Sequence, residues 1–147
     1  MPDGRRSLPG LTHNPLFLLG PKGSGKTHLI HAIVWQAAAL PKQRVIYRSA
    51  ERFTAEFEFA NAIGIEQKKC RLLAIFRAYY SGADILLLDD IQMLSGKETL
   101  VEFLHLFDTL LGARKQLFLS GSCRPDEIAS IIPQLVTRLE RGLAAER

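Results

Sequence analysis

The sequence contains little cysteine and no apolar stretch long enough to cross a membrane. Its two cysteines, Cys70 and Cys123, form no CxxC pair and lack the spacing of metal ligands, so both are expected to be free thiols. No apolar run approaches the ~20 residues that a membrane-spanning helix needs. Residues 1–13 also contain no apolar stretch of the kind found in secretory signals. These absences predict a cytoplasmic protein with no membrane partner.

Internal repeats and low-complexity tracts are also missing, and the composition is that of one globular domain. Hydrophobic residues make up 47% and charged residues 23% of the 147 positions, which is enough apolar material for a packed core. The net charge of +4 permits contact with nucleic acid but does not by itself indicate it.

Apolar strands alternate with amphipathic helices after residues 1–13, which form an expected flexible leader rich in proline and glycine. The expected strands are residues 15–19, 44–47, 84–88 and 116–120, with a fifth at 142–145. The expected helices are residues 26–40, 51–62, 67–80, 98–111, 126–132 and 134–140. Strands that are apolar on both faces and alternate with helices predict an α/β fold, with a parallel sheet covered on both sides. Ligands of such sheets bind at the carboxyl ends of the strands.

The strongest motif is GPKGSGKT, which begins at Gly20 and matches the P-loop pattern GxxxxGK[ST]. Its glycines permit positive φ and close backbone approach, so that backbone N–H groups meet phosphates at a helix N-terminus. Lys26 is expected to reach the β- and γ-phosphates, and the Thr27 hydroxyl to complete a Mg²⁺ shell. The motif predicts ATP or ADP binding by Gly20, Pro21, Lys22, Gly23, Ser24, Gly25, Lys26, Thr27 and His28.

A second motif, ILLLDD, is an apolar strand that ends in Asp89 and Asp90. Asp89 is expected to hold Mg²⁺ through water, and Asp90 to orient or deprotonate the water that attacks the γ-phosphate. Two acids at the end of a strand also occur in ordinary turns. The P-loop earlier in the chain favours the catalytic interpretation.

The fourth expected strand ends in Ser120, Gly121 and Ser122. In a sheet of this type it lies between the two motif strands, so a polar side chain at its end can sense the γ-phosphate or hold the attacking water. Ser122 is the better candidate for this catalytic role. The alternative is that the serine caps the helix that starts after Pro125.

Arg138 lies on the last expected helix. An arginine there can act in trans, as a finger that reaches the γ-phosphate bound by a neighbouring subunit. On sequence spacing alone, a solvated arginine is the favoured interpretation.

These residues together resemble the bacterial replication initiator family DnaA. The likeness rests on NPLFLLG, KTHLIHAI, SAERF, YYSGADILLLDDIQMLSGKE, EFLHLFDTL and TRLERGL, and runs from Asn14 to about Leu143. The resemblance implies a three-layer AAA+ P-loop domain with a five-stranded parallel sheet in the order 5-1-4-3-2. It also implies that residues 14–147 form the nucleotide-binding core, with Asp89 and Asp90 as Walker B and Arg138 as the arginine finger.

In this family the helices between the second and third strands form an initiator-specific insertion, here Glu51 to Tyr80. The resemblance implies ATP-dependent head-to-tail self-association into a filament that grips single-stranded origin DNA, with helicase or other replication proteins as further partners. Lys68, Lys69, Arg71 and Lys97 are the candidate DNA contacts.

The sequence departs from the family at several positions. Ser122 and Cys123 replace the aspartate–arginine pair of the sensor, and Gln134 replaces an arginine of the finger segment. Asp90 is one methylene shorter than the glutamate usual in AAA+ motors, which predicts slow hydrolysis suited to a switch. No part of the sequence corresponds to the family's helical lid or duplex-binding domain, so both are expected to be absent.

Three functions therefore remain open at the level of sequence. The first is an ATP-switched assembly protein in the initiation of chromosomal replication, with weak ATPase activity. The second is a DnaA-related regulator or a helicase loader, which shares the same core. The third is an interaction module that no longer hydrolyses ATP.

Overall fold

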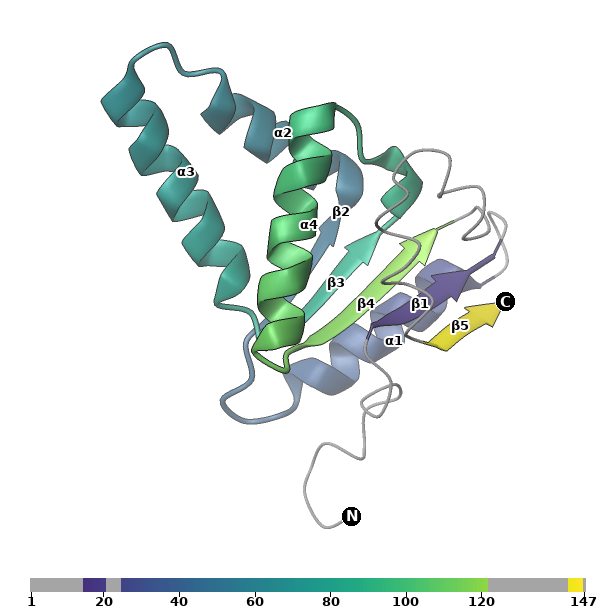
Figure 1. Ribbon diagram of the computed structural model, residues 1–147. Helices are drawn as coiled ribbons and strands as arrows, with labels where there is room; N and C mark the ends of the chain where they lie inside the picture. Colours follow the sequence, from purple (N-terminus) through teal and green to yellow (C-terminus); the bar gives the residue numbers. More distant parts are fainter. Residues whose placement is uncertain (1–14, 21–24, 122–142, 147) are drawn as a thin grey trace.

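A parallel five-stranded sheet runs through the centre of the protein (Figure 1). The computed structural model describes residues 15–20, 25–121 and 143–146. The strands are β1 (Leu16–Leu19), β2 (Val45–Ser49), β3 (Ile85–Asp89), β4 (Gln116–Gly121) and β5 (Leu143–Glu146). Their order is β2-β3-β4-β1-β5, and each neighbouring pair is parallel. The predicted order 5-1-4-3-2 is confirmed.

Helices connect the strands at nearly the predicted positions. They are α1 (Lys26–Ala38), α2 (Ala50–Asn61), α3 (Glu66–Ser81) and α4 (Lys97–Gly112), and a short 3₁₀ helix, η2 (Ile91–Met93), follows β3. The sequence did not predict η2. The expected leader at residues 1–13 and the expected helices at 126–132 and 134–140 lie outside the described residues.

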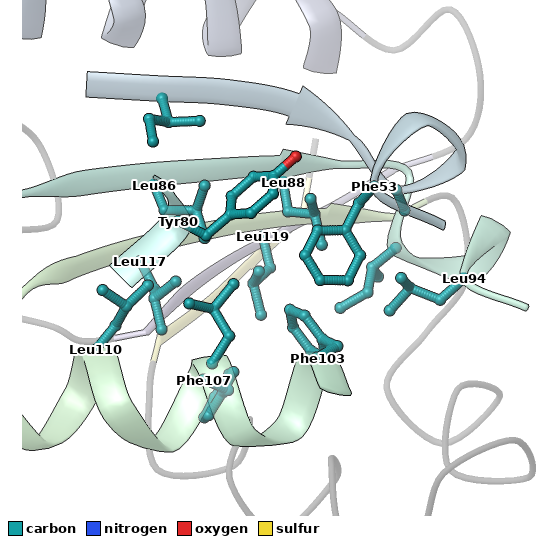
Figure 2. Close-up of a cluster of buried hydrophobic side chains, with 14 of the residues drawn as sticks. Phe53, Tyr80, Leu86, Leu88, Leu94, Phe103, Phe107, Leu110, Leu117 and Leu119 are labelled. Carbon is teal, nitrogen blue, oxygen red and sulfur yellow. The ribbon is translucent and has the colours of Figure 1, made fainter. Parts of the chain in front are cut away.

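The helices form a layer on each side of the sheet, and each layer has its own apolar cluster. α1 covers one face, called here the α1 face, where Ile30 and Ile33 pack against Leu87 and Phe118 of the sheet. On the opposite face α2, α3 and α4 surround an aromatic cluster that includes Phe53, Tyr80, Phe103 and Phe107 (Figure 2). The central strands β3 and β4 therefore place apolar side chains on both faces of the sheet, as their composition predicted.

Local signals account for the ends of several elements. The Ser49 side chain accepts a hydrogen bond of 3.1 Å from the backbone N–H of Arg52, which caps the N-terminus of α2. α1 ends at Ala38, shortly before Pro41, which lacks the N–H needed to continue a helix. None of the described helices is long and apolar enough to cross a bilayer.

Candidate functional site: a phosphate-binding edge of the sheet

The first part of the site lies where β1 ends and α1 begins. The backbone N–H of Gly20 donates to the carbonyl of Gly121 over 3.2 Å, so the end of β1 is fixed beside the end of β4. Gly25 is the N-cap of α1 with φ 91°, a left-handed conformation that glycine adopts without a steric penalty. Lys26, the first residue of α1, is only 6% exposed. The predicted strand–glycine–helix geometry is confirmed at Gly25.

The structure describes only part of the predicted nucleotide-binding set. Residues 21–24, which comprise Pro21, Lys22, Gly23 and Ser24, lie outside the described residues, and their phosphate contacts stay predictions. Thr27 lies in the first turn of α1, but its side chain is outside the described part. The role of Thr27 as a Mg²⁺ ligand is therefore also a prediction. His28, in the same turn, is exposed.

The second motif lies directly opposite the first. Asp89 is the last residue of β3, and Asp90 follows it in a left-handed conformation, with φ 56° and ψ 58°. This backbone conformation is uncommon for residues other than glycine, although aspartate tolerates it better than most. It turns the Asp90 carboxylate toward α1, where Asp90 Oδ1 lies 3.1 Å from Lys26 Nζ. The structure thus joins two motifs that are 64 residues apart.

The Asp89 carboxylate is held by one hydroxyl group from each neighbouring strand. Tyr47 of β2 donates its O–H to Asp89 Oδ2 over 2.9 Å. Ser120 of β4 donates its O–H to Asp89 Oδ1. The Ser120 oxygen also accepts the backbone N–H of Asp90 over 2.9 Å. A single serine therefore ties both acids to β4.

The register of the sheet explains why these groups meet. Tyr47 pairs with Leu87 of β3, and Leu87 pairs with Phe118 of β4. Because side chains alternate between the faces of a strand, residues two further along, Asp89 and Ser120, lie on the same face as Leu87 and Phe118. That face is the α1 face, which also carries Lys26.

Tyr47 has a strongly perturbed hydroxyl group. Burial raises its pKa to about 12, and the hydrogen bond to Asp89 and the negative charges of Asp89 and Asp90 act in the same direction. The ring of His31 on α1 packs edge-on against the Tyr47 ring, with centroids 5.9 Å apart. Tyr47 is therefore a fixed, protonated hydrogen-bond donor at neutral pH.

The sequence did not identify two members of this cluster, Ser120 and Tyr47, as site residues. Ser122 was the preferred polar residue at the end of β4, but it lies outside the described residues, and Ser120 is the serine that contacts the acids. Tyr47 was assigned only to a strand. A polar side chain near the carboxyl end of β2, on the α1 face, was the signal that could have identified it.

The other candidate residues are not brought to this cluster. Lys68, Lys69 and Arg71 belong to the first half of α3, which Figure 1 draws at the far end of the α2–α3 hairpin from α1. Lys97 is the first residue of α4 and is exposed. Arg138 lies outside the described residues.

The geometry brings together an ammonium group, two carboxylates, two hydroxyls and the N-terminus of α1 at one edge of the sheet. A model of the family described as "Bacterial DnaA ATPase domain" matches residues 6–146. The chain belongs to this DnaA ATPase domain family. The chromosomal replication initiator protein DnaA of Microcystis aeruginosa is 43% identical over 95% of this chain, and DnaA of Aquifex aeolicus is 41% identical over 93%.

Solved DnaA structures agree with the fold. A replication initiator DnaA bound to AMPPCP and single-stranded DNA is similar to this chain, with a TM-score of 0.76 and 38% identity. The aligned region covers 94% of this chain and 41% of that structure's chain. The chain spans 30% and 33% of the length of the two DnaA relatives named above. A DnaC helicase loader shares the fold alone, at 15% identity and a TM-score of 0.68 over 90% of this chain and 77% of that one.

Proposed function

We propose that this chain binds ATP and ADP together with Mg²⁺ and, as part of a DnaA-type initiator, switches its assembly on origin DNA during the initiation of chromosomal replication. The observation that carries the proposal is the buried Lys26 ammonium at the N-terminus of α1, facing Asp90 at 3.1 Å. A buried cation next to a helix N-terminus attracts phosphate. When the γ-phosphate arrives, Lys26 exchanges the carboxylate of Asp90 for phosphate oxygens.

The two acids fit a Mg²⁺ ion that is held mainly through water and phosphate. Mg²⁺ typically binds to one or two carboxylates plus substrate phosphates and keeps several of its waters. Each oxygen of Asp89 accepts one hydroxyl, which leaves each with a further lone pair for a Mg²⁺-bound water. When bound, Mg²⁺ neutralises charge on the β- and γ-phosphates.

Hydrolysis is proposed to be slow, at or below ~1 s⁻¹, the low end of typical enzyme turnover. Asp90 would orient or deprotonate the attacking water once phosphate has taken Lys26 from it. Its short side chain holds that water less closely than a glutamate would. Ser120, which accepts the N–H of Asp90, supports Asp90 in this geometry, and Ser122 stays a candidate for sensing the γ-phosphate.

The partners proposed for the whole initiator follow from its relatives. A DnaA relative was solved with AMPPCP and single-stranded DNA, which supports single-strand binding by the initiator. Lys68, Lys69, Arg71 and Lys97 are the residues that we propose for this contact. Head-to-tail self-association would use Arg138 in trans, and other replication proteins, a helicase among them, are further proposed partners. All of these partners, like the family itself, agree with a cytoplasmic location. Identity of 43% to an initiator, against 15% to a helicase loader, favours the initiator role.

Replacing Lys26 by Ala tests the binding site. Charge-assisted hydrogen bonds contribute ~1.5–3 kcal/mol, so the affinity for Mg²⁺-ATP, measured with a fluorescent ATP analogue, is expected to fall about tenfold or more. Lys68→Ala, which removes one exposed lysine from α3, is the matched control and should bind ATP like the unchanged protein.

Phosphate release, measured on the same preparations, distinguishes a slow ATPase from an interaction module that binds ATP without hydrolysing it. A chain that binds ATP but never releases phosphate is the interaction module without turnover. If Lys26→Ala binds ATP as tightly as the unchanged protein, the proposed site is wrong.

A further inference from the structure

Tyr47 is an unexplained part of the site. Motif residues account for Lys26, Asp89 and Asp90, but no motif requires a tyrosine on β2. Yet the Tyr47 hydroxyl reaches Asp89 Oδ2 at 2.9 Å, and Asp89 is 7% exposed. If Asp89 holds Mg²⁺ as proposed, a tyrosine hydroxyl bonded to its carboxylate affects the orientation in which that carboxylate meets the metal.

The geometry around Asp89 limits the rotation of its carboxylate. Tyr47 holds Oδ2 from β2, and Ser120 holds Oδ1 from β4. These donors lie on opposite sides of β3 in the sheet. Rotation of the carboxylate about its Cβ–Cγ bond would break at least one of the two bonds. The lone pairs that remain free therefore have a fixed direction.

Tyr47 is itself held in place. Its strand pairs with β3 through a continuous parallel register from Val45 to Ser49. Its ring packs against apolar residues of the α1 face and edge-on against His31. A donor with so little freedom fixes its acceptor at a low cost in conformational entropy.

From this arrangement we infer that Tyr47 is a positioning residue, which holds the Asp89 carboxylate in the orientation that receives the water shell of Mg²⁺. The inference rests on the proposed function, because it assumes that Mg²⁺-nucleotide binds at this edge of the sheet. In this role Tyr47 acts through its hydrogen bond to Asp89 and not by binding nucleotide or metal itself. Ser120 gives the matching contact on the other oxygen and also ties Asp90 to β4.

Tyr47→Phe removes the hydroxyl and keeps the ring. Loss of a hydrogen-bond partner behind a metal-binding group typically weakens metal affinity about 10- to 100-fold. Asp89 is proposed to bind through water, so the expected effect is at the lower end, about tenfold. The measurement is the Mg²⁺ concentration at half-maximal enhancement of ADP binding, followed with a fluorescent ADP analogue. In EDTA, the affinity for ADP should stay unchanged.

Tyr79→Phe is the matched control. Tyr79 lies on α3, and its hydroxyl accepts a hydrogen bond of 2.8 Å from Arg48, so this variant also loses one hydroxyl contact. It should need the same Mg²⁺ concentration as the unchanged protein. Urea unfolding without nucleotide, in EDTA, reports any change in fold stability for both variants.

The outcomes distinguish the inference from the function on which it rests. If the unchanged protein binds ADP equally well with Mg²⁺ and with EDTA, the proposed Mg²⁺ site is wrong. If it responds to Mg²⁺ and Tyr47→Phe responds at the same concentration, the positioning role is overturned. Equal weakening of ADP binding in EDTA and in Mg²⁺, with a lower urea midpoint, would mean that Tyr47 has only a structural role.

Discussion

Asp90 combines a strained backbone with an ion pair to Lys26. Both features bear on the proposed exchange of Lys26 from Asp90 to the phosphate. Its left-handed backbone costs free energy in an L-residue other than glycine. The contacts that maintain it are the N–H bond to Ser120 and the ion pair with Lys26. Because the side chain of Asp90 is 44% exposed, an incoming phosphate can compete for Lys26. Asp90 is therefore expected to give up its contact with Lys26 when phosphate binds.

Asp90→Asn tests this double role. The amide cannot accept a proton from the attacking water, so ATP hydrolysis should fall about 100-fold or more, the usual cost of losing a general base. Lys26 no longer faces a carboxylate, so nucleotide affinity in EDTA should rise. Phosphate release and fluorescent ATP binding measure the two effects. Asp108→Asn, an exposed position on α4, is the control, and unchanged hydrolysis by Asp90→Asn would contradict the assignment.

At the scale of elements, the α2–α3 hairpin is joined to the body of the domain by ion pairs as well as by its aromatic core. Arg77 of α3 donates two hydrogen bonds, of 2.9 and 3.0 Å, to the buried carboxylate of Glu102 on α4. These bonds to Glu102 raise the pKa of Arg77. On the other helix of the hairpin, α2, Glu56 accepts hydrogen bonds from Arg48 of β2 and from the hydroxyl of Tyr80 on α3.

Arg77→Ala should destabilise the domain, because it leaves the buried Glu102 without its bidentate partner. Hydrogen bonds to charged groups contribute ~1.5–3 kcal/mol. The Arg77 side chain is 57% exposed, so solvent screening reduces the expected loss to about 1–2 kcal/mol. Urea unfolding measures it. Arg71→Ala, an exposed position on the same helix, should stay within ~0.5 kcal/mol; an equal loss there would show that the effect belongs to α3 in general.

Most of the elements were predictable because their signals are local. Each signal lies within a few residues of the element that it predicts. Examples are the apolar run before Asp89, the glycines before Lys26 and the proline after α1. The contacts of Tyr47 and Ser120 with Asp89 were not predicted, since they depend on the register between strands that are far apart in the chain. Likewise, no local pattern indicates that Arg77 reaches Glu102, or that Asp90 takes a left-handed backbone before η2.

For the whole molecule, strand order determines which chemistry is possible. β4 lies between β1 and β3, so the P-loop strand and the acidic strand are separated by one strand and end at the same edge. This order brings Lys26 of α1 to the acids that follow β3, where the proposed Mg²⁺-nucleotide would bind. The head-to-tail contact proposed above would require nucleotide at this edge to be accessible to a second subunit.

Arg138→Ala tests assembly. Arg138 is predicted to reach ATP bound by the neighbouring subunit, because a planar, permanently charged guanidinium can bridge two phosphate oxygens. The variant should keep the ATP affinity of the monomer but lose ATP-dependent assembly, as measured by sedimentation with ATP and with ADP. Arg141→Ala is the nearby control. Loss of ATP affinity in the Arg138→Ala monomer would mean that this arginine acts on its own site.

Strand order also determines when the site can form as the chain folds. β1 is synthesised first among the described strands, yet its neighbours in the sheet are β4 and β5, which are the last two of them. Pairing between such distant segments closes a long loop of intervening chain, which makes it slower than pairing between strands that are close in sequence. β1 must wait for both partners to leave the ribosome. We therefore expect the edge that joins Lys26 to Asp89 and Asp90 to form late in folding, so that nucleotide binds only after the rest of the sheet has assembled.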